Sequence, residues 1–144
     1  MRVSRTAITP YTAKEMYTLV ADVESYPRFL PWCRSASLLL GEGNEVRATI
    51  ELAYHGVQRT FTTHNHLQPD RTIDMRLVDG PFRQLEGGWR FIPLGDQGCK
   101  VCLDLNYEFS SRLLTLAVGP VFNPIANSLV EAFHKQAVQI YGKR

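Results

Sequence analysis

FNPIANSLVEAFHKQAVQIY, residues 122–141, is the longest amphipathic stretch of the chain. Its apolar side chains recur at helical spacing, at Phe122, Ile125 or Ala126, Leu129, Val130, Phe133, Ala137 and Ile140. Charged residues such as Glu131 and Lys135 lie mostly off this stripe, as in a helix with one buried face. The spacing therefore predicts one long terminal helix, and we expect Pro120 and Pro124 to start or kink it.

The opening of the chain predicts a strand, a helix and a proline-bounded turn. Residues 3–9 read as an edge strand with polar side chains interleaved. The tetrapeptide Thr12-Ala13-Lys14-Glu15 is a capping box, and apolar residues then recur at helical spacing, so we expect a helix from Ala13 to about Val23. Pro27 and Pro31 restrict the next segment to a short turn of helix and a loop.

Between these helical segments, apolar and polar residues alternate with a period of two. The alternating stretches span residues 49–54, 61–66, 72–77, 85–91 and 99–109. One apolar and one polar face on each strand is typical of an antiparallel sheet that meets water on one side. Glycine, proline, asparagine and aspartate in the breaks between the stretches supply turns.

This order of elements predicts an α+β fold with a single domain over residues 1–144. Because one long helix must cover the apolar sheet face, we expect a curved antiparallel β-sheet wrapped around the long C-terminal α-helix, with two short helices after the first strand. Gly87 and Gly88 permit sharp curvature. A strongly bent sheet around a helix leaves a gap, so we predict an apolar cavity between them.

Composition places the chain among ordinary globular proteins, with 44% hydrophobic and 21% charged residues and a net charge of +2. The arginines are scattered, and we expect no sequence-specific DNA partner. No apolar signal segment opens the chain, and residues 113–125 fall short of the ~20 apolar residues of a spanning helix. We therefore expect a cytoplasmic protein, able to lie peripherally at the inner membrane.

The cysteines and histidines offer little chemistry. The odd count of Cys33, Cys99 and Cys102 indicates reduced thiols in a cytosolic chain. The last two form a C-x-x-C pair, but three residues apart on a strand they point to opposite faces, which excludes a redox pair. His64 and His66 share one strand face at a spacing that can hold a metal, yet they point away from the apolar face and no third ligand is evident.

Catalytic groups are also missing from the pattern. Cys33 has no visible base beside it, and Asp104 and Glu108 fall on the outer sheet face. No glycine-rich phosphate loop, G-x-S-x-G or H-E-x-x-H motif occurs. We therefore expect a protein that is not an enzyme, with no metal site and no cofactor.

The candidate ligand-binding residues are the apolar side chains that the strand and helix patterns turn inward. They are Tyr54, Phe61, Met75, Trp89, Phe91, Leu103, Leu105, Tyr107, Phe122, Val130 and Phe133. We expect some of them to form plain core and others to line the cavity. The hydroxyl of Tyr54 or Tyr107, or the Trp89 N–H, would serve as a hydrogen-bond donor there.

The proline-flanked loop at Phe29, Leu30 and Trp32 is a candidate gate or partner-binding element. An exposed apolar loop tip favours contact with a partner or a membrane surface. The apolar residues 113–118 could assist at the same interface. The alternative is that both segments pack on the rim of the sheet.

Several short motifs together resemble the START-like (SRPBCC, helix-grip) superfamily of polyketide cyclase/dehydrase-like proteins. They are Ser4-Arg5-Thr6 with Pro10-Tyr11, residues 22–31 (DVESYPRFLP), Phe61-Thr62-Thr63, residues 77–82 (LVDGPF), Gly87-Gly88-Trp89-Arg90-Phe91, Tyr107-Glu108-Phe109 and Val130-Glu131-Ala132-Phe133. They span nearly the whole chain and resemble most the subfamily of the coenzyme Q-binding proteins and the ribosome-association toxin RatA. Relatives often carry a basic residue near Gln136, so this chain departs from the subfamily there.

The resemblance implies a hydrophobic cavity and one of two activities. The first is non-enzymatic binding of a hydrophobic ligand, ubiquinone or another polyisoprenoid quinone, in support of respiratory electron transport. The second is a RatA-like toxin activity, in which the protein binds the large ribosomal subunit and blocks subunit association. A polyketide aromatase or cyclase is a third alternative, which would require acid and base groups inside the cavity.

Overall fold

The computed structural model describes residues 1–144, and its elements follow the predicted order. They are β1 (Arg2–Thr9), α1 (Ala13–Ala21), the 3-10 helix η1 (Val23–Arg28), β2 (Cys33–Leu40), β3 (Glu45–Tyr54), β4 (Val57–Gln68), β5 (Thr72–Asp79), β6 (Phe82–Leu94), β7 (Gly98–Phe109) and α2 (Arg112–Tyr141). The strands form one seven-stranded antiparallel sheet in the order β1-β7-β6-β5-β4-β3-β2. The predicted α+β class and the two short helices after the first strand are confirmed.

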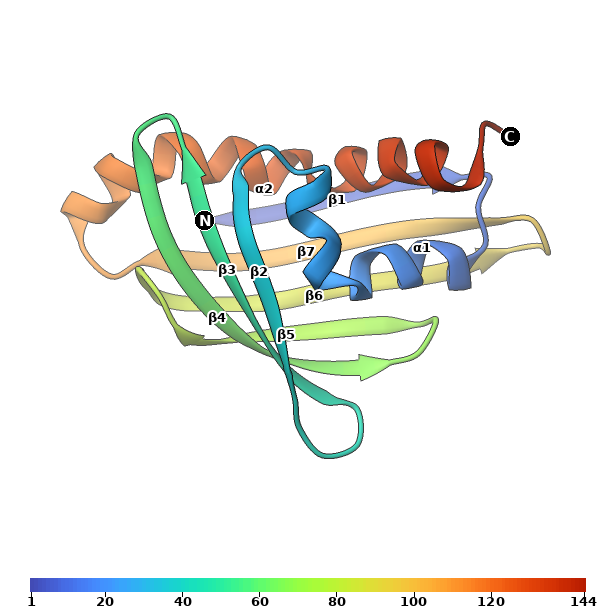
Figure 1. Ribbon diagram of the computed structural model, residues 1–144, viewed down its shortest axis with the longest axis horizontal. Coiled ribbons are helices and arrows are strands. Elements are labelled where there is room, and N and C mark those ends of the chain that lie inside the picture. The colour runs from blue at the N-terminus through green and yellow to red at the C-terminus, as the bar shows by residue number, and fades with distance from the viewer.

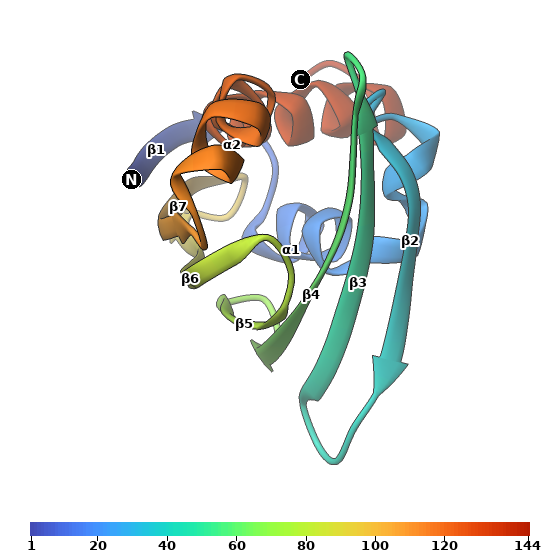
Figure 2. The ribbon, with the colours of Figure 1, turned by 90° about the vertical axis from the view of Figure 1, so that its left-hand side faces the viewer.

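The sheet is strongly bent around the helices. Figure 1 shows α2 lying along the molecule above the strands, with α1 below it in front of the sheet. Seen from the end, β2, β3 and β4 form one wall, β5 the floor, and β6, β7 and β1 the other wall, while α2 lies across the opening (Figure 2). The concave face therefore carries the core, as the alternation of apolar residues predicts.

The predicted capping box at the start of α1 is present. The Thr12 hydroxyl accepts a hydrogen bond from the Glu15 N–H at 3.1 Å, and the Glu15 carboxylate accepts one from the Thr12 N–H at 3.0 Å. The helix ends at Ala21 rather than near Val23, because η1 begins there and tightens the chain before Pro27.

The long terminal helix begins earlier than its amphipathic stripe indicates. It starts at Arg112, where the Ser111 hydroxyl caps it by accepting a hydrogen bond from the Leu114 N–H at 3.1 Å. Pro120 and Pro124 lie inside the helix, so the prediction that either one starts it is wrong. Each proline removes one helical hydrogen bond, and the packing of α2 on the sheet holds the helix together through both.

By length and composition alone α2 could cross a membrane, since an 18-residue window has a mean hydropathy of 1.5. Its contacts, however, are with β1, β7, β4 and α1, and eight of its residues are buried. A helix that packs on a sheet in a globular protein passes the same test, so the hydropathy of α2 is weak evidence for a membrane span.

The bend of the sheet depends on close strand contact at Gly87. Its φ is +151°, and a Cβ there would lie 2.1 Å from the Asp104 carbonyl oxygen and 2.8 Å from the Leu105 Cα on β7. At Gly88 a Cβ would lie 2.5 Å from the Ile73 carbonyl oxygen on β5. Only glycine allows this approach, which agrees with the predicted role of these two residues in curvature.

Candidate functional site

A cavity of about 90 Å³ lies between the concave sheet face and α2. Its 17 lining residues, 15 of them hydrophobic, come from every part of the fold except β1, α1 and β2: Val23, Tyr26, Trp32, Ala48, Ile50, Phe61, Thr63, Asn65, Met75, Leu85, Trp89, Leu105, Phe122, Ile125, Ala126, Leu129 and Phe133. Strand parity directs alternate side chains of β3 to β7 inward, and the stripe of α2 closes the space. The predicted apolar hollow is therefore present and small.

Six predicted ligand-binding residues line this cavity. They are Phe61, Met75, Trp89, Leu105, Phe122 and Phe133. Four others, Phe91, Leu103, Tyr107 and Val130, are buried in the surrounding core without lining it. The hydroxyl of Tyr107 is engaged as a donor to the Asn123 side-chain oxygen, and burial raises the pKa of Tyr107 to about 12. These four residues support the walls.

The prediction that Tyr54 points into the cavity is wrong. Tyr54 is the last residue of β3 and is 39% exposed, with its ring against His55 at a centroid distance of 4.1 Å. The chain reverses there through His55 and Gly56, which both have positive φ. Alternation along a strand assigns an inward face only where the strand still lies over the core, and β3 has passed the core at this point.

Two polar lining residues, Thr63 and Asn65, are absent from the predicted set. Each is 5% exposed, and the Thr63 hydroxyl donates a hydrogen bond to the Asn65 side-chain oxygen at 2.7 Å. Parity places both on the same face of β4 as Phe61, so the sequence contains the signal that they point inward. A selection of inward positions by hydrophobicity alone does not find them.

The candidate gate loop packs on the rim rather than projecting from it. Leu30 is 1% and Trp32 is 8% exposed, and the ring of Phe29 contacts those of Tyr26 and Phe133 at centroid distances of 6.2 and 5.5 Å. The exposed-tip alternative is therefore wrong for this loop. In residues 113–118 the outcome is mixed: Leu113 and Leu116 are exposed and Val118 is buried.

An open groove of about 790 Å³ runs outside the cavity, between the gate loop and α2. Its walls include Phe29, Leu30, Pro31, Trp32, Tyr54 and residues of α2 between 124 and 139, with Gln136 among them. Trp32 and Ile125 line both the groove and the cavity. These two side chains therefore form the partition between the inner space and the surface.

The electrostatic environment of the cavity is neutral. No carboxylate, histidine, lysine or arginine lines it. The Tyr26 hydroxyl donates to the Val20 carbonyl oxygen, and burial raises the pKa of Tyr26 far above its usual value. Burial also raises the pKa of the nearby Cys33 thiol to about 11, so this thiol stays protonated at neutral pH and is a poor nucleophile.

The two histidines lie on the outer face, as parity predicts. His64 Nε2 and His66 Nδ1 each lie 2.6 Å from one oxygen of the Glu45 carboxylate. No group of three or more histidine, cysteine, aspartate or glutamate side chains is arranged to hold a metal ion. The cysteines are all free, and the Cys99 sulfur lies 3.7 Å from the Thr9 hydroxyl.

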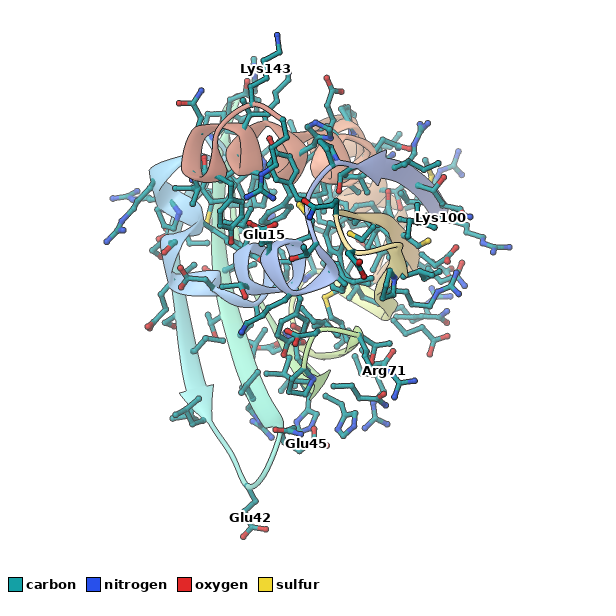
Figure 3. The ribbon with its side chains drawn as sticks, turned by 90° about the vertical axis from the view of Figure 1, so that its right-hand side faces the viewer. Glu15, Glu42, Glu45, Arg71, Lys100 and Lys143 are labelled. Atoms are coloured by element: carbon teal, nitrogen blue, oxygen red, sulfur yellow. The ribbon has the colours of Figure 1, made fainter.

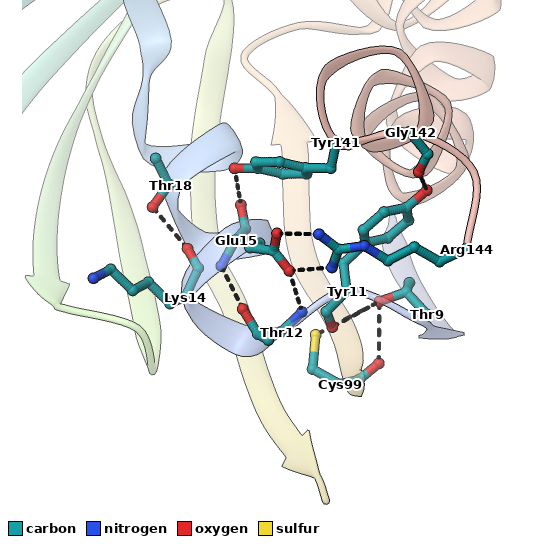
Figure 4. A network of polar contacts seen from close by, with 10 residues as sticks. All are labelled: Thr9, Tyr11, Thr12, Lys14, Glu15, Thr18, Cys99, Tyr141, Gly142 and Arg144. Atoms are coloured by element: carbon teal, nitrogen blue, oxygen red, sulfur yellow. Dashed lines mark hydrogen bonds and ion pairs between the residues drawn. The ribbon is translucent and has the colours of Figure 1, made fainter. Parts of the chain in front are cut away.

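At the far end of α2, a polar network joins the C-terminal residues to α1 (Figure 4). The Arg144 guanidinium makes two hydrogen bonds to the Glu15 carboxylate, at 2.6 and 2.8 Å. The Tyr141 hydroxyl donates to the Glu15 carbonyl oxygen at 3.0 Å, and the Tyr11 hydroxyl donates to the Gly142 carbonyl oxygen at 2.6 Å. We call these five residues the terminal clasp. It fixes one end of α2 and leaves the part over the cavity without polar ties to α1.

The pKa of Glu15 reflects this network. The hydrogen bonds from Arg144, followed by that from the Thr12 N–H, lower its pKa from 4.5 to about 2. The carboxylate is therefore ionised throughout the neutral range.

Known proteins share both the sequence and the geometry of this chain. Residues 9–134 match the family described as polyketide cyclase/dehydrase and lipid transport. The ribosome association toxin RatA of Escherichia coli is 43% identical over 143 residues, which cover 99% of this chain and 90% of that protein. The mitochondrial coenzyme Q-binding protein COQ10 homolog B of Xenopus laevis is 30% identical, over 98% of this chain and 59% of that protein.

Solved structures agree on the fold. A START superfamily protein from Mycobacterium smegmatis matches with a TM-score of 0.78 and 21% identity, over 96% of this chain and 98% of that chain. The Zhui aromatase/cyclase of a Streptomyces species matches with a TM-score of 0.78 and 19% identity, over 95% and 93%. The match of residues 9–134 shows that the chain belongs to the polyketide cyclase/dehydrase and lipid transport family, and the solved structures agree with its START-type helix-grip fold, a bent sheet around α2.

Proposed function

We propose that this protein binds a hydrophobic small molecule without transforming it, and that the ligand is a polyisoprenoid quinone. The observation that carries the proposal is the apolar cavity beneath α2, whose lining holds aromatic rings and no charged group. Trp89 and Phe133, which contact each other edge to face at a centroid distance of 5.4 Å, give the cavity aromatic walls against which a flat apolar ring can pack. The name of the Xenopus coenzyme Q-binding relative supports this choice of ligand.

The size of the cavity decides how such a ligand must bind. A pocket for a drug-sized ligand measures roughly 300–1,000 Å³, so a space of about 90 Å³ cannot hold a quinone with its tail. The adjoining groove of about 790 Å³ can hold the tail once the partition moves. We therefore propose that Trp32 and Ile125 are displaced on binding, so that the ring lies inside and the tail runs along the groove.

Lipid extraction and native mass spectrometry of protein purified from a quinone-producing host test this proposal. The expected result is co-purified quinone. The matched control is Ala126→Leu, which places a larger side chain at a cavity-lining position that is 1% exposed, and it should fold and lose the quinone. Absence of quinone from the unmodified protein, with no uptake when quinone is added, would contradict the proposal.

The quinone would be taken from the inner membrane, and the N-terminal turn of α2 offers a contact surface. Leu113 and Leu116 there are 75% and 68% exposed. Vesicle flotation measures this contact, and Leu113→Ser with Leu116→Ser should reduce it. Flotation that is equal for both proteins would exclude this surface.

A second candidate function is association with the large ribosomal subunit, and the relatives favour it. Proteins named as ribosome association toxins from Escherichia coli, Vibrio cholerae and Pseudomonas aeruginosa are 40–44% identical over 97–99% of this chain. Overexpression followed by sucrose-gradient sedimentation should show fewer 70S particles and co-sedimentation with the large subunit. Unchanged 70S particles without co-sedimentation would contradict this function.

The groove residue Gln136 provides a matched variant for the ribosome experiment. If a basic residue at this place contacts ribosomal RNA in relatives, Gln136→Arg should strengthen co-sedimentation and make it more sensitive to salt. An unchanged gradient profile would show that this position does not contact the ribosome.

The aromatase or cyclase alternative receives the least support. The similarity to the Streptomyces aromatase/cyclase is 19% and carries the fold alone. Acid–base catalysis needs titratable groups at the substrate. The only titratable side chain in the cavity lining is Tyr26, and its hydroxyl already donates a hydrogen bond to the Val20 carbonyl oxygen. The neutral lining supports a binding role.

A further inference from the structure

The cavity contains one polar group whose hydrogen-bonding capacity is half used. The side-chain oxygen of Asn65 accepts the hydrogen bond from the Thr63 hydroxyl, whereas the Asn65 Nδ2 makes no hydrogen bond. The residue as a whole is 5% exposed, and its Nδ2 atom keeps some accessible surface. Asn65 is one of the residues that line the cavity, so this donor is available to a ligand bound there.

Asn65 borders a second hollow as well. A smaller cavity of about 30 Å³ lies behind the first, and Asn65 is its only lining residue that is not hydrophobic. The two spaces share Val23, Tyr26, Asn65, Met75 and Trp89. The unbranched side chain of Met75, which pairs with Asn65 across β4 and β5, can change rotamer and join them. Asn65 would then stand at the centre of one enlarged chamber.

An amide whose N–H groups have no partner is unfavourable in apolar surroundings. On the same face of β4, the neighbours Phe61 and Leu67 are apolar. The Thr63 hydroxyl orients the amide so that its N–H groups remain free. A buried donor that is held in place and left unpaired is what a site needs for a ligand that carries an acceptor.

We propose that the Asn65 amide is the specificity-determining donor of the cavity, and that it binds a carbonyl oxygen of a planar apolar ligand. This inference rests on the proposed binding function and adds the chemistry by which the site would distinguish a carbonyl compound from a hydrocarbon of the same shape. Recognition by a buried donor discriminates strongly, because the unpaired amide is satisfied only by a ligand with an acceptor.

Duroquinone and durene are the probes that test this proposal. Both are tetramethyl-substituted six-membered rings, and only duroquinone carries carbonyl groups. Its ring is fully substituted, so the free thiols of the protein do not add to it. Isothermal titration of the full chain should give tighter binding of duroquinone than of durene. In Asn65→Leu, duroquinone affinity should fall about 10-fold, as for a lost hydrogen bond, with durene affinity unchanged.

The outcomes separate this inference from the proposed function. If both probes bind and Asn65→Leu leaves duroquinone unaffected, or weakens both probes equally, the cavity binds ligands and the role of Asn65 is refuted. If the unmodified protein binds neither probe, the binding function fails and this inference fails with it. A preference for the reduced hydroquinone, whose hydroxyl oxygens are weaker acceptors than the quinone carbonyls, would also overturn it.

Stability measurements exclude a purely structural role. Urea denaturation of Asn65→Leu should give a midpoint close to that of the unmodified protein, because the variant removes an unpaired donor and also leaves the buried Thr63 hydroxyl without its acceptor. A lower midpoint together with lost binding of both probes would assign Asn65 to the fold instead. Asn65→Ala is the second variant, and it should keep durene binding and lose the preference for duroquinone. Thr63→Val is the control, and it should affect duroquinone less than Asn65→Leu does.

Discussion

The two halves of α2 are held in different ways. At its C-terminal end, the terminal clasp joins the helix to α1 through polar groups that are all paired, and Figure 3 shows Glu15 lying between α1 and this end of α2. In the middle of the helix, Phe122, Ile125, Ala126 and Leu129 line the cavity, and the polar ties of this part run from Asn123 and Asn127 to β7 and β1 rather than to α1. One helix thus has an end that a polar network holds to α1 and a middle that borders a void, which suits a ligand that binds between α2 and the sheet.

Phe133 lies where these two regions meet, and its truncation should have the largest effect. It is 1% exposed, and its ring contacts Tyr26, Trp89 and Phe29. Phe133→Ala should lower the free energy of unfolding by about 3–5 kcal/mol in urea denaturation. Leu129→Ala, at a half-buried position beside the existing void, should cost about 1–2 kcal/mol. Equal costs would show that the two regions are packed equally well.

The sheet beneath the cavity should prove rigid, unlike the helix above it. Gly87→Ala should cost about 2–3 kcal/mol, because its φ of +151° disfavours a side chain and a Cβ would meet the β7 backbone. Gly95→Ala is the matched control, since its φ is +66° and nothing lies within 4 Å of a Cβ there, and it should cost about 1 kcal/mol. Both values come from urea denaturation. A Gly87→Ala cost as small as that of the control would mean that β6 and β7 can move apart to accommodate the side chain.

The terminal clasp should depend on pH through Glu15. Its pKa is lowered from 4.5 to about 2 in the folded protein, so the carboxylate stabilises the fold fully above pH 4.5. This contribution is lost as the pH falls from 4.5 toward 2. Glu15→Gln should therefore have a lower denaturation midpoint than the unmodified protein at pH 7. This decrease should be smaller than that caused by Gly87→Ala, and it should vanish near pH 2.

Glu131→Gln is the control for this pH dependence. Glu131 pairs with Lys135 at 3.3 Å on the exposed face of the same helix, with side chains 73% and 75% exposed. Such a pair contributes little, so the variant should match the unmodified protein at every pH. A pH-dependent difference here as large as that of Glu15→Gln would remove the distinction between the clasp and an ordinary surface pair.

Apart from the Glu131→Gln control, the smallest effect is expected at the N-terminal turn of α2, outside both regions. Leu113→Ser with Leu116→Ser should change the free energy of unfolding by less than about 1 kcal/mol, because both side chains are already exposed. A larger loss in urea denaturation would place this turn within the core.

Much of the fold could be predicted because it depends on local periodicity. The alternation over residues 99–109 and the helical stripe over residues 122–141 each define a buried face without knowledge of its partner. The capping box at Thr12 and Glu15 likewise involves residues three apart, and the structure contains it. The start of α2 was missed because Ser111 caps a turn with no continuous stripe, while Pro120 and Pro124 obscured the helix around them.

The site could be predicted only in part. The alternation along the strands predicts that Phe61 and Trp89 point inward, and both line the cavity. The same rule failed for Tyr54, because only the bent sheet shows that the end of β3 lies beyond the core. Selecting inward positions by hydrophobicity also left out Asn65, because only the tertiary structure shows that an inward polar side chain borders a cavity.

The sequence by itself determined which side chains are apolar, which share a face and where helices and strands alternate, since these are properties of residues near one another in the chain. Only the tertiary structure decided which of those faces meet closely and which leave a hollow. A cavity remains where two packed surfaces do not meet. Its size is set by the distances between the sheet, with Gly87 in its bend, and α2, which the terminal clasp holds at one end. Those distances join residues far apart in the chain, and no local pattern encodes them.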